Sequence, residues 1–228
     1  RSGNTAARGT GTPSSNANYS VAGALLDGSF ADGINSLNFI NYPTAINFVN
    51  GAYAADGARA DPLKITNRWI YKFHGTDDMY AAWVLIGSGG SLIAGEGYTM
   101  KGTDGTVPLA TKQNYAFRGK PYNGDFTIPI TLGWDRLIGN PYPSAMDARE
   151  FIKDNIQDNG RNTTGNIFNG TIYYWNHFGE KDSHILREYV GGYATYNLTG
   201  KASAYSNDTR IDHSNPSNTD SKEPEQYI

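Results

Sequence analysis

Residues 171–178 read TIYYWNHF, and residues 189–198 read YVGGYATYNL. Both stretches are rich in Tyr, Trp, Thr and Ile, the residue types that fit a pleated, half-buried strand. Each is bounded by polar sequence of the kind that forms turns, which predicts two strands in the second half of the chain. The pair Gly191-Gly192 predicts a bulge in the second strand, or a close approach of another backbone segment.

The first half of the chain repeats this pattern. Residues 65–73 (ITNRWIYKF) predict a strand in which Trp69, Tyr71 and Phe73 share one face, because side chains alternate along a strand. Residues 80–86 (YAAWVLI) predict the next strand. Shorter strands are expected at residues 37–49, 95–101, 114–118 and 124–130, after an apolar stretch with Val21, Leu25, Leu26 and Phe30.

One short helix is expected around residues 145–156. Ser144 and Asp147 have the spacing of a capping box, with Ser144 as the N-cap. Ala148, Ile152 and Ile156 then recur at every fourth position and would form one apolar face. The fold class that follows is all-β: a β-sandwich of jelly-roll-like or Ig-like character, with this helix between its halves.

Composition narrows the class of protein. The chain has 228 residues with 27 Gly, 16 Tyr and no Cys, and its formal net charge is −3. Without cysteine there is no disulfide, no thiolate metal site and no cysteine nucleophile, and we interpret the chain as a bacterial extracellular protein. Lys and Arg form no basic stripe, so nucleic acid is not an expected partner. No apolar stretch is long enough to span a bilayer.

The polar residues 1–20 predict a disordered leader or an irregular loop. Residues 21–228 are expected to form one large β-sandwich domain. A weak internal similarity links WIYKF and GEGYTMKG in the first half with IYYW and GGYATYNLTG in the second. This similarity suggests an alternative organisation as two related β units, about 21–130 and 131–228.

Several motifs resemble a region found in large cell-surface proteins of Bacteroidota. They are LIGNPYPSAMDAREFI (137–152), GTIYYWNHFG (170–179), VGGYATYNLTG (190–200), GEGYTMKGT (95–103) and NYAFRGKPYNGDF (114–126). The resemblance covers residues 65–200 and implies an adhesin-like cargo of the type IX secretion system, located extracellularly at the bacterial surface. It implies a role in adhesion or envelope structure, with other domains of the same protein or envelope proteins as partners, and it assigns no catalytic residue.

The resemblance also implies that the chain is an interior fragment of a longer protein. A Gly-aromatic strand is expected shortly after residues 225–228 (EQYI), and a Trp-containing strand is expected before Arg1.

The best enzymatic candidates are His177, His184 and Glu188, which could bind zinc or act as acid and base. Their spacing does not match the helical HExxH pattern, and histidines of a solvated turn are the preferred interpretation.

Glycoside hydrolysis needs two carboxylates across a cleft, and Glu96, Asp125, Asp135 and Glu188 are candidates. Glu96, between two glycines, is equally interpreted as a solvent-exposed turn residue. Neither a Gly-Xaa-Ser-Xaa-Gly elbow in strand-turn-helix context nor a Walker loop occurs, so we expect no enzyme.

Exposed aromatic side chains could stack on sugar rings, with core packing as the alternative. The candidates for a ligand-binding surface are Trp83, Tyr122, Trp134, Trp175 and His177. Calcium is the candidate cofactor, with hydrated acidic turns as the alternative interpretation. Its candidate ligands are Asp77, Asp78, Asp154, Asp158, Asp208 and Asp212. Five Asn-Xaa-Ser/Thr sequences, at Asn18, Asn162, Asn169, Asn197 and Asn207, are attributed to the Asn-rich composition.

Three functional hypotheses follow. The first is a non-enzymatic surface module in adhesion or envelope structure. The second is a carbohydrate-binding module, which predicts a row of exposed Trp or Tyr side chains on one sheet face. The third is a glycan-acting hydrolase that uses Glu96 or Glu188 with a nearby histidine.

Overall fold

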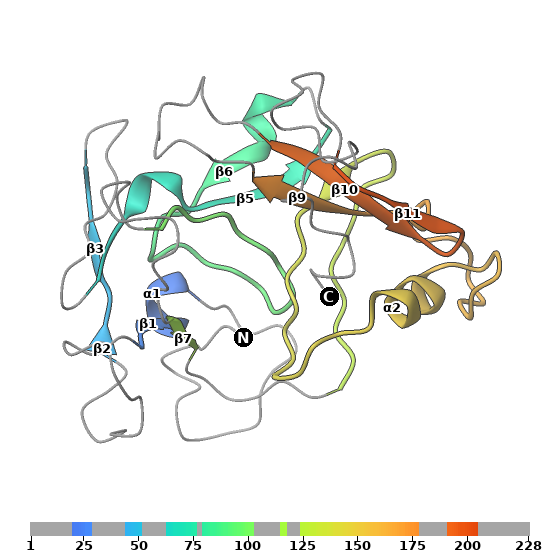
Figure 1. Ribbon diagram of the computed structural model, residues 1–228, viewed down its shortest axis with the longest axis horizontal. Coiled ribbons are helices and arrows are strands. Elements are labelled where there is room, and N and C mark those ends of the chain that lie inside the picture. The colour runs from blue at the N-terminus through green and yellow to red at the C-terminus, as the bar shows by residue number, and fades with distance from the viewer. Residues whose placement is uncertain are drawn as a thin grey trace, which may run out of the picture. The chain divides into compact units, whose positions relative to one another are not determined.

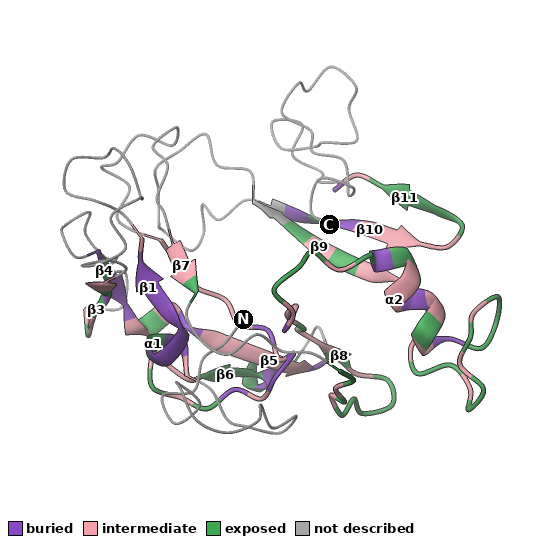
Figure 2. Ribbon diagram, turned by 90° about the horizontal axis from the view of Figure 1, so that it is seen from below, coloured by how far each residue is buried: buried purple, intermediate pink, exposed green. Residues whose placement is uncertain are grey.

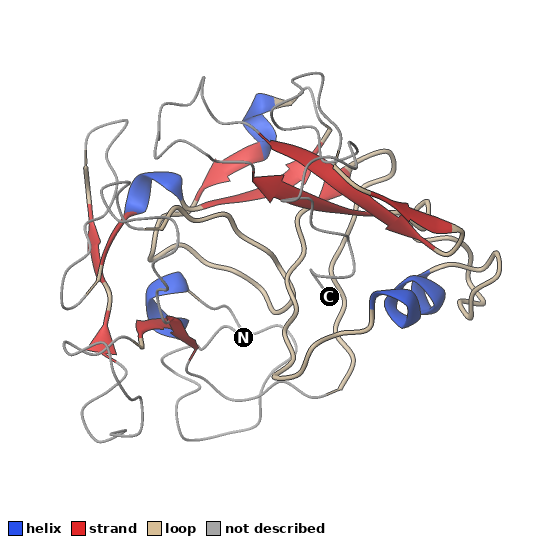
Figure 3. Cartoon of the chain, viewed as in Figure 1, coloured by secondary structure: helices blue, strands red, loops and turns tan. Residues whose placement is uncertain are grey.

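The computed structural model describes residues 20–28, 44–51, 63–76, 79–102, 115–117, 124–177 and 191–204. The chain divides into two compact units, Arg1–Ser144 and Ala145–Ile228. Strands in mostly antiparallel sheets dominate the described part, and its helices are few and short (Figure 3). The predicted all-β class with a small helix is therefore confirmed, while the sandwich arrangement stays a prediction.

The core of the first unit begins with a single helical turn, α1 (Val21–Ala24), which runs directly into β1 (Leu25–Asp27) (Figure 1). All three residues of β1 are buried, as the purple ribbon in Figure 2 shows. Strand β1 pairs antiparallel with β2 (Thr44–Ala45) on one side and with β7 (Tyr115–Phe117) on the other. The buried side chains of this core are Val21, Leu25, Ile46, Leu63, Ile65, Ile70 and Leu92.

Residues 65–73 do not form the single strand that their sequence predicts. The strand β4 (Lys64–Thr66) pairs in parallel with β3 (Asn47–Val49) and ends at Thr66. There the Thr66 hydroxyl accepts a hydrogen bond from the backbone N–H of Arg68 and caps the 3₁₀ helix η2 (Asn67–Trp69). A side chain that competes for backbone donors favours such a turn over a continuing strand.

The chain leaves this turn into a second sheet, in the order β6-β5-β8. Its central strand is β5 (Tyr71–Gly75), flanked by β6 (Trp83–Leu85) and β8 (Asp135–Arg136). The strand predicted at 80–86 begins only at residue 83, because the 3₁₀ helix η3 (Tyr80–Ala82) precedes it. Residues 95–101 contribute isolated bridges rather than a named strand, and residues 124–130 carry none.

The second unit opens with the helix α2 (Ala148–Asn155). Its N-cap is Asp147 and not Ser144: one carboxylate oxygen of Asp147 accepts from the backbone N–H groups of Arg149 and Glu150 at 2.8 and 3.1 Å. The carboxylate reaches two of the free donors of the first turn at once, which is the geometry of an N-cap. The predicted apolar face is confirmed, because Ala148, Ile152 and Ile156 are all buried.

The sheet of the second unit has the order β11-β10-β9. Strand β9 (Ile172–His177) pairs antiparallel with β10 (Gly191–Asn197) in an unbroken register from His177–Gly191 to Ile172–Tyr196. The short strand β11 (Gly200–Ala202) pairs with the other edge of β10. The prediction of a bulge at Gly191-Gly192 is wrong, because each of these glycines has its own partner in β9.

Candidate functional site

One face of the β9–β10 pair carries a row of exposed aromatic side chains, which we call the aromatic face: Tyr173, Trp175 and Tyr193. Their exposed fractions are 51%, 48% and 52%. The row arises from strand alternation, since Tyr173 and Trp175 are two residues apart on β9 and the register places Tyr193 opposite Trp175. Residues of the other parity point into the unit: Ala194 is fully buried and packs against Tyr174.

The three rings hold each other in place. The Tyr193 ring meets the Trp175 ring edge-on, at 5.1 Å between centroids and 68° between planes. It also meets the Tyr173 ring edge-on, at 6.4 Å and 88°. Edge-to-face packing at these separations is favourable and limits the motion of each ring. The result is a preorganised apolar surface with exposed ring area.

Such a surface suits a pyranose ring. The C–H faces of the sugar are apolar while its hydroxyl groups lie at the ring edge, so an aromatic side chain can contact the C–H face and leave the hydroxyls in water. Exposed apolar patches of a few hundred Å² on soluble proteins commonly mark interaction sites.

The predicted ligand-binding residues fall in different places. Trp175 is part of the aromatic face, and His177 follows it on β9, where it pairs with Gly191. Trp83 belongs to the first unit, is 36% exposed and packs on Phe73 with ring centroids 4.7 Å apart. Trp134, also in the first unit, is partly buried and meets His74 edge-on at 5.1 Å. Tyr122 lies outside the described residues.

Sequence reasoning did not single out Tyr173 or Tyr193. Alternation on β9 was a signal that could have indicated Tyr173, because it is two residues from Trp175. Tyr193 could not be found in this way, since its place beside Trp175 depends on the register between two strands that are separated in the sequence.

The first unit contains a buried charge cluster of Glu96, Arg136 and Lys72. The Arg136 guanidinium donates to Glu96 Oε1 at 2.8 Å, and both side chains are more than nine-tenths buried, with 8% of Arg136 and 6% of Glu96 exposed. Lys72 Nζ lies 3.5 Å from the same oxygen. The backbone N–H of Ile93 donates to the other oxygen, Oε2, at 3.2 Å. The interpretation of Glu96 as a solvent-exposed turn residue is therefore wrong.

Neither glycine that flanks Glu96 has room for a side chain. Gly95 has a φ of +84°, and a Cβ on it would meet the Phe126 ring at 2.4 Å. A Cβ on Gly97 would come within 2.6 Å of the carbonyl oxygen of Ile138. The bridge between Glu96 and Ile138 thus requires bare backbone on both sides of the glutamate. The Gly-Glu-Gly motif positions an ion pair.

His74 is next to this cluster, on the same strand as Lys72. Its Nε2 accepts a hydrogen bond from the backbone N–H of Thr131 at 3.1 Å, so this nitrogen is unprotonated. Burial lowers the pKa of His74 below its ordinary value of 6.5, and the positive charge of Arg136 lowers it further, while Glu96 acts in the opposite direction. The hydrolase hypothesis requires a histidine near Glu96, and His74 is near it. Both carboxylate oxygens of Glu96, however, already accept hydrogen bonds from the protein.

Two of the other candidate carboxylates are described by the structure and lie at the surface. Asp125 and Asp135 are exposed, and Asp135 pairs through its backbone with Gly75. His184 and Glu188 lie outside the described residues.

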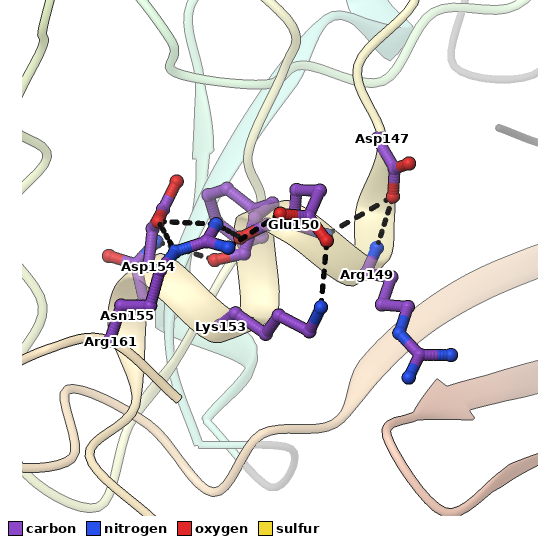
Figure 4. A network of polar contacts seen from close by, with 8 residues as sticks. Asp147, Arg149, Glu150, Lys153, Asp154, Asn155 and Arg161 are labelled. Atoms are coloured by element: carbon purple, nitrogen blue, oxygen red, sulfur yellow. Dashed lines mark hydrogen bonds and ion pairs between the residues drawn. The ribbon is translucent and has the colours of Figure 1, made fainter. Parts of the chain in front are cut away.

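Around α2 the charged side chains form a surface network (Figure 4). Arg161 donates to Glu150 Oε2 at 2.6 Å and to Asp154 Oδ1 at 2.7 Å, and Lys153 donates to Glu150 Oε1 at 2.9 Å. Hydrogen bonds from Lys153 and Arg161 lower the pKa of Glu150 to about 2. The Asp154 carboxylate, a candidate calcium ligand, is thus paired with a guanidinium.

Of the remaining calcium candidates, the structure describes Asp158 alone. Asp158 Oδ2 accepts from the Asn166 amide at 2.8 Å. Within the described ranges, no group of three or more His, Cys, Asp or Glu side chains could hold a metal ion. Asp77, Asp78, Asp208 and Asp212 lie outside those ranges, so calcium stays a prediction.

Three of the Asn-Xaa-Thr sequences have the same local structure. The side-chain oxygens of Asn162, Asn169 and Asn197 each accept from the backbone N–H two residues later, at 2.9 Å in every case. These are Asx turns, in which the side chain replaces a backbone acceptor. The Asn in these sequences therefore shapes turns, which composition alone did not indicate.

Comparison with known proteins gives one family. A family model described as a domain of unknown function, DUF8693, matches residues 58–224, which is more than half of the chain. No curated protein and no solved structure matches the chain. Across the part of the chain that the structure describes, none of the helices has the length and apolarity that crossing a membrane requires.

Proposed function

The chain belongs to the DUF8693 family, and we propose that it is a non-catalytic glycan-binding module whose aromatic face stacks on sugar rings. The observation that carries the proposal is the row of Tyr173, Trp175 and Tyr193, each about half exposed and held edge-to-face on one sheet face. A row of exposed aromatic side chains on one sheet face is what the carbohydrate-binding hypothesis predicts, and it supports the proposal.

The size of the face supports a weak but specific binding surface. Tyr and Trp each offer roughly 150–250 Å², so three half-exposed rings present roughly 200–400 Å². At about 25 cal/mol per Å², covering about 300 Å² would contribute about 7 kcal/mol before the costs of association are subtracted. Those costs are on the order of 4–15 kcal/mol. The three rings alone therefore supply at most about 3 kcal/mol of net binding free energy, a dissociation constant of roughly several mM, and tighter binding needs hydrogen bonds to the sugar hydroxyls as well.

Rigidity reduces one of these costs. The Trp175 and Tyr193 rings already restrict each other, and the sheet below them is anchored by the buried Ala194 and Ala204. A preformed surface loses little side-chain entropy when a ligand binds.

The hydrolase alternative has less support. Glu96 is buried in an ion pair with Arg136, and its second oxygen accepts from a backbone N–H. A general acid or nucleophile needs a carboxylate that can reach a substrate, and this one is engaged within the protein on both oxygens.

Binding is tested with the purified chain on a glycan array, followed by titration calorimetry with each bound glycan. Trp175→Ala and Tyr193→Ala are expected to weaken binding at least about tenfold, because a central aromatic contact contributes about 1.4 kcal/mol or more. Trp175→Phe keeps an aromatic ring and should recover part of the loss. Tyr80→Ala is the matched control, since Tyr80 is 84% exposed and lies in the first unit.

Circular dichroism and the melting temperature of each variant show whether it is folded. The proposal is wrong if the array captures no glycan, or if glycan binding is unchanged in both Trp175→Ala and Tyr193→Ala.

In a cell, this binding would serve attachment or envelope structure at a bacterial surface, as the resemblance to Bacteroidota surface proteins implies. Protease treatment of intact bacteria that carry the gene, followed by mass spectrometry, tests that location. Peptides of this chain should be released from intact cells. Their appearance only after lysis would contradict it.

A further inference from the structure

A cavity of about 210 Å³ lies within the second unit. It is bordered by the loop after α2, by the residues just before β9, and by the turn that joins β10 to β11. Its lining residues include the apolar Ile156 and Phe168 and the polar Asn159, Asn169 and Asn197.

The turns around the cavity are shaped by asparagine side chains. Asn197 Oδ1 accepts from the backbone N–H groups of Thr199 and Gly200, both at 2.9 Å. Asn169 Oδ1 accepts from the backbone N–H of Thr171 at 2.9 Å. Each carbonyl oxygen is used to close an Asx turn. The amide nitrogens of Asn169 and Asn197 have no protein partner among the described residues, so their N–H donors are available to a ligand.

The loop after α2 contributes a third asparagine to the lining, Asn159. Asn159 has a φ of +60°, a conformation that Asn and Gly adopt more readily than other residues.

The described lining disfavours two classes of ligand. Among the described residues, it contains no Lys, Arg or His, so an anion would find no counter-charge there. It contains one carboxylate, Asp158, which already accepts from Asn166, whereas calcium takes six to eight oxygen ligands. Amide donors beside an apolar wall are suited to a neutral molecule that has hydroxyl groups and an apolar face.

The volume limits the size of that molecule. Pockets for drug-sized ligands measure about 300–1,000 Å³, so this cavity suits a single small ring.

The cavity and the aromatic face share strand β10, because Asn197 at the end of that strand lines the cavity. Tyr193, Thr195 and Asn197 share one face of β10 by alternation, and Asn197 is four residues beyond Tyr193. At about 3.3 Å per residue, the separation along the strand is about 13 Å. A short oligosaccharide can extend over such a distance.

We propose that this cavity takes one neutral sugar ring, the terminal residue of the glycan that lies on the aromatic face. This inference rests on the proposed function and adds that the protein recognises the end of a glycan chain.

Replacing Asn by Asp, which has nearly the same shape, tests the role of the side-chain N–H donors. Asn169→Asp and Asn197→Asp keep the acceptor that closes each Asx turn and replace the N–H donors with a second acceptor oxygen. Asn162→Asp is the matched control, because Asn162 closes the same kind of turn, with the same 2.9 Å bond, and does not line the cavity.

The probe is the tightest-binding neutral oligosaccharide from the array, before and after an exoglycosidase removes its terminal residue. For the unmodified chain, trimming should weaken binding about five- to tenfold, the loss expected for one or two neutral hydrogen bonds. Asn169→Asp and Asn197→Asp should bind the intact oligosaccharide about five- to tenfold more weakly, and trimming should then have little further effect. Asn162→Asp should behave like the unmodified chain.

Nuclear magnetic resonance provides a second readout. The backbone amide signals of Gly170 and Thr199, which line the cavity, should shift when the intact oligosaccharide is added and not when the trimmed one is added.

The outcomes separate the two proposals. Binding that depends on Trp175 but is unchanged in Asn169→Asp and Asn197→Asp would overturn the terminal-sugar site alone. The same conclusion follows if trimming has no effect on the unmodified chain. If no glycan binds at all, the proposed function and the terminal site fail together.

Discussion

The buried charge cluster gives the sharpest prediction about stability. Glu96→Gln removes the negative charge that Arg136 and Lys72 share, and leaves a guanidinium that is 92% buried without its counter-charge. The neutral amide still offers an oxygen to the backbone N–H of Ile93, so the substitution changes the charge with little change in shape.

The expected magnitude follows from the geometry. At the 2.8 Å separation of Arg136 and Glu96, Coulomb's law gives an attraction of about 6 kcal/mol at an effective dielectric constant of about 20. Desolvation of both groups offsets part of that attraction in the folded chain. Removing one partner of a buried pair typically lowers the free energy of unfolding by about 3–5 kcal/mol. With a urea dependence of about 2 kcal/mol per M, the unfolding midpoint of the first unit should fall by about 2 M.

Tryptophan fluorescence during urea unfolding is the assay, because Trp69, Trp83 and Trp134 lie in the first unit and only Trp175 lies in the second. Arg136→Met should cause a loss of similar size. The double variant should lose at least about 2 kcal/mol less than the sum of the single losses, because the second substitution removes the orphaned charge.

Additive losses in the double variant would refute the reasoning, since they would mean that the two groups do not stabilise each other. A midpoint shift of Glu96→Gln below about 0.5 M would do the same, because it corresponds to only about 1 kcal/mol, the value of an exposed ion pair.

Three further predictions concern other positions. Gly97→Ala should lower the free energy of unfolding by about 1–3 kcal/mol, because the new Cβ would lie 2.6 Å from a carbonyl oxygen. Gly89→Ala is the control, because a Cβ there has no atom within 4 Å, and urea unfolding should show no such loss. Burial lowers the pKa of His74 in the folded state, so the unfolded chain binds a proton at this residue more readily. The free energy of unfolding should therefore fall as the pH drops below 6.5. A urea unfolding midpoint that does not change with pH below 6.5, or that changes equally in His74→Gln, would contradict this. Asp147→Ala should cost about 1 kcal/mol in urea unfolding followed by circular dichroism, and a larger cost for Ser144→Ala would show that the cap is misassigned.

Part of this protein is determined by local sequence. The strands at 172–177 and 191–197 and the apolar face of α2 follow from side-chain periodicity and strand propensity, and all were expected close to where they lie. The all-β class follows from the same patterns. These features depend on residues that are near one another in the chain.

Local capping was harder to predict, because several polar residues compete for the same donors. Ser144 and Asp147 both suit an N-cap, and only the path of the backbone decided for Asp147. The Thr66 hydroxyl similarly ended a strand that propensity would have continued through Trp69.

The candidate sites depend on contacts between distant residues. Glu96 and Arg136 are 40 residues apart, and their pairing converts an apparent surface glutamate into a buried charge. Tyr193 lies beside Trp175 because of the register between β9 and β10. The sequence between these strands has no tight-turn motif that would fix this register. The sequence by itself determined which strands are aromatic and which helix face is apolar, because periodicity is local. The tertiary structure alone decided which aromatic rings meet and which charges pair, because those depend on register and on burial.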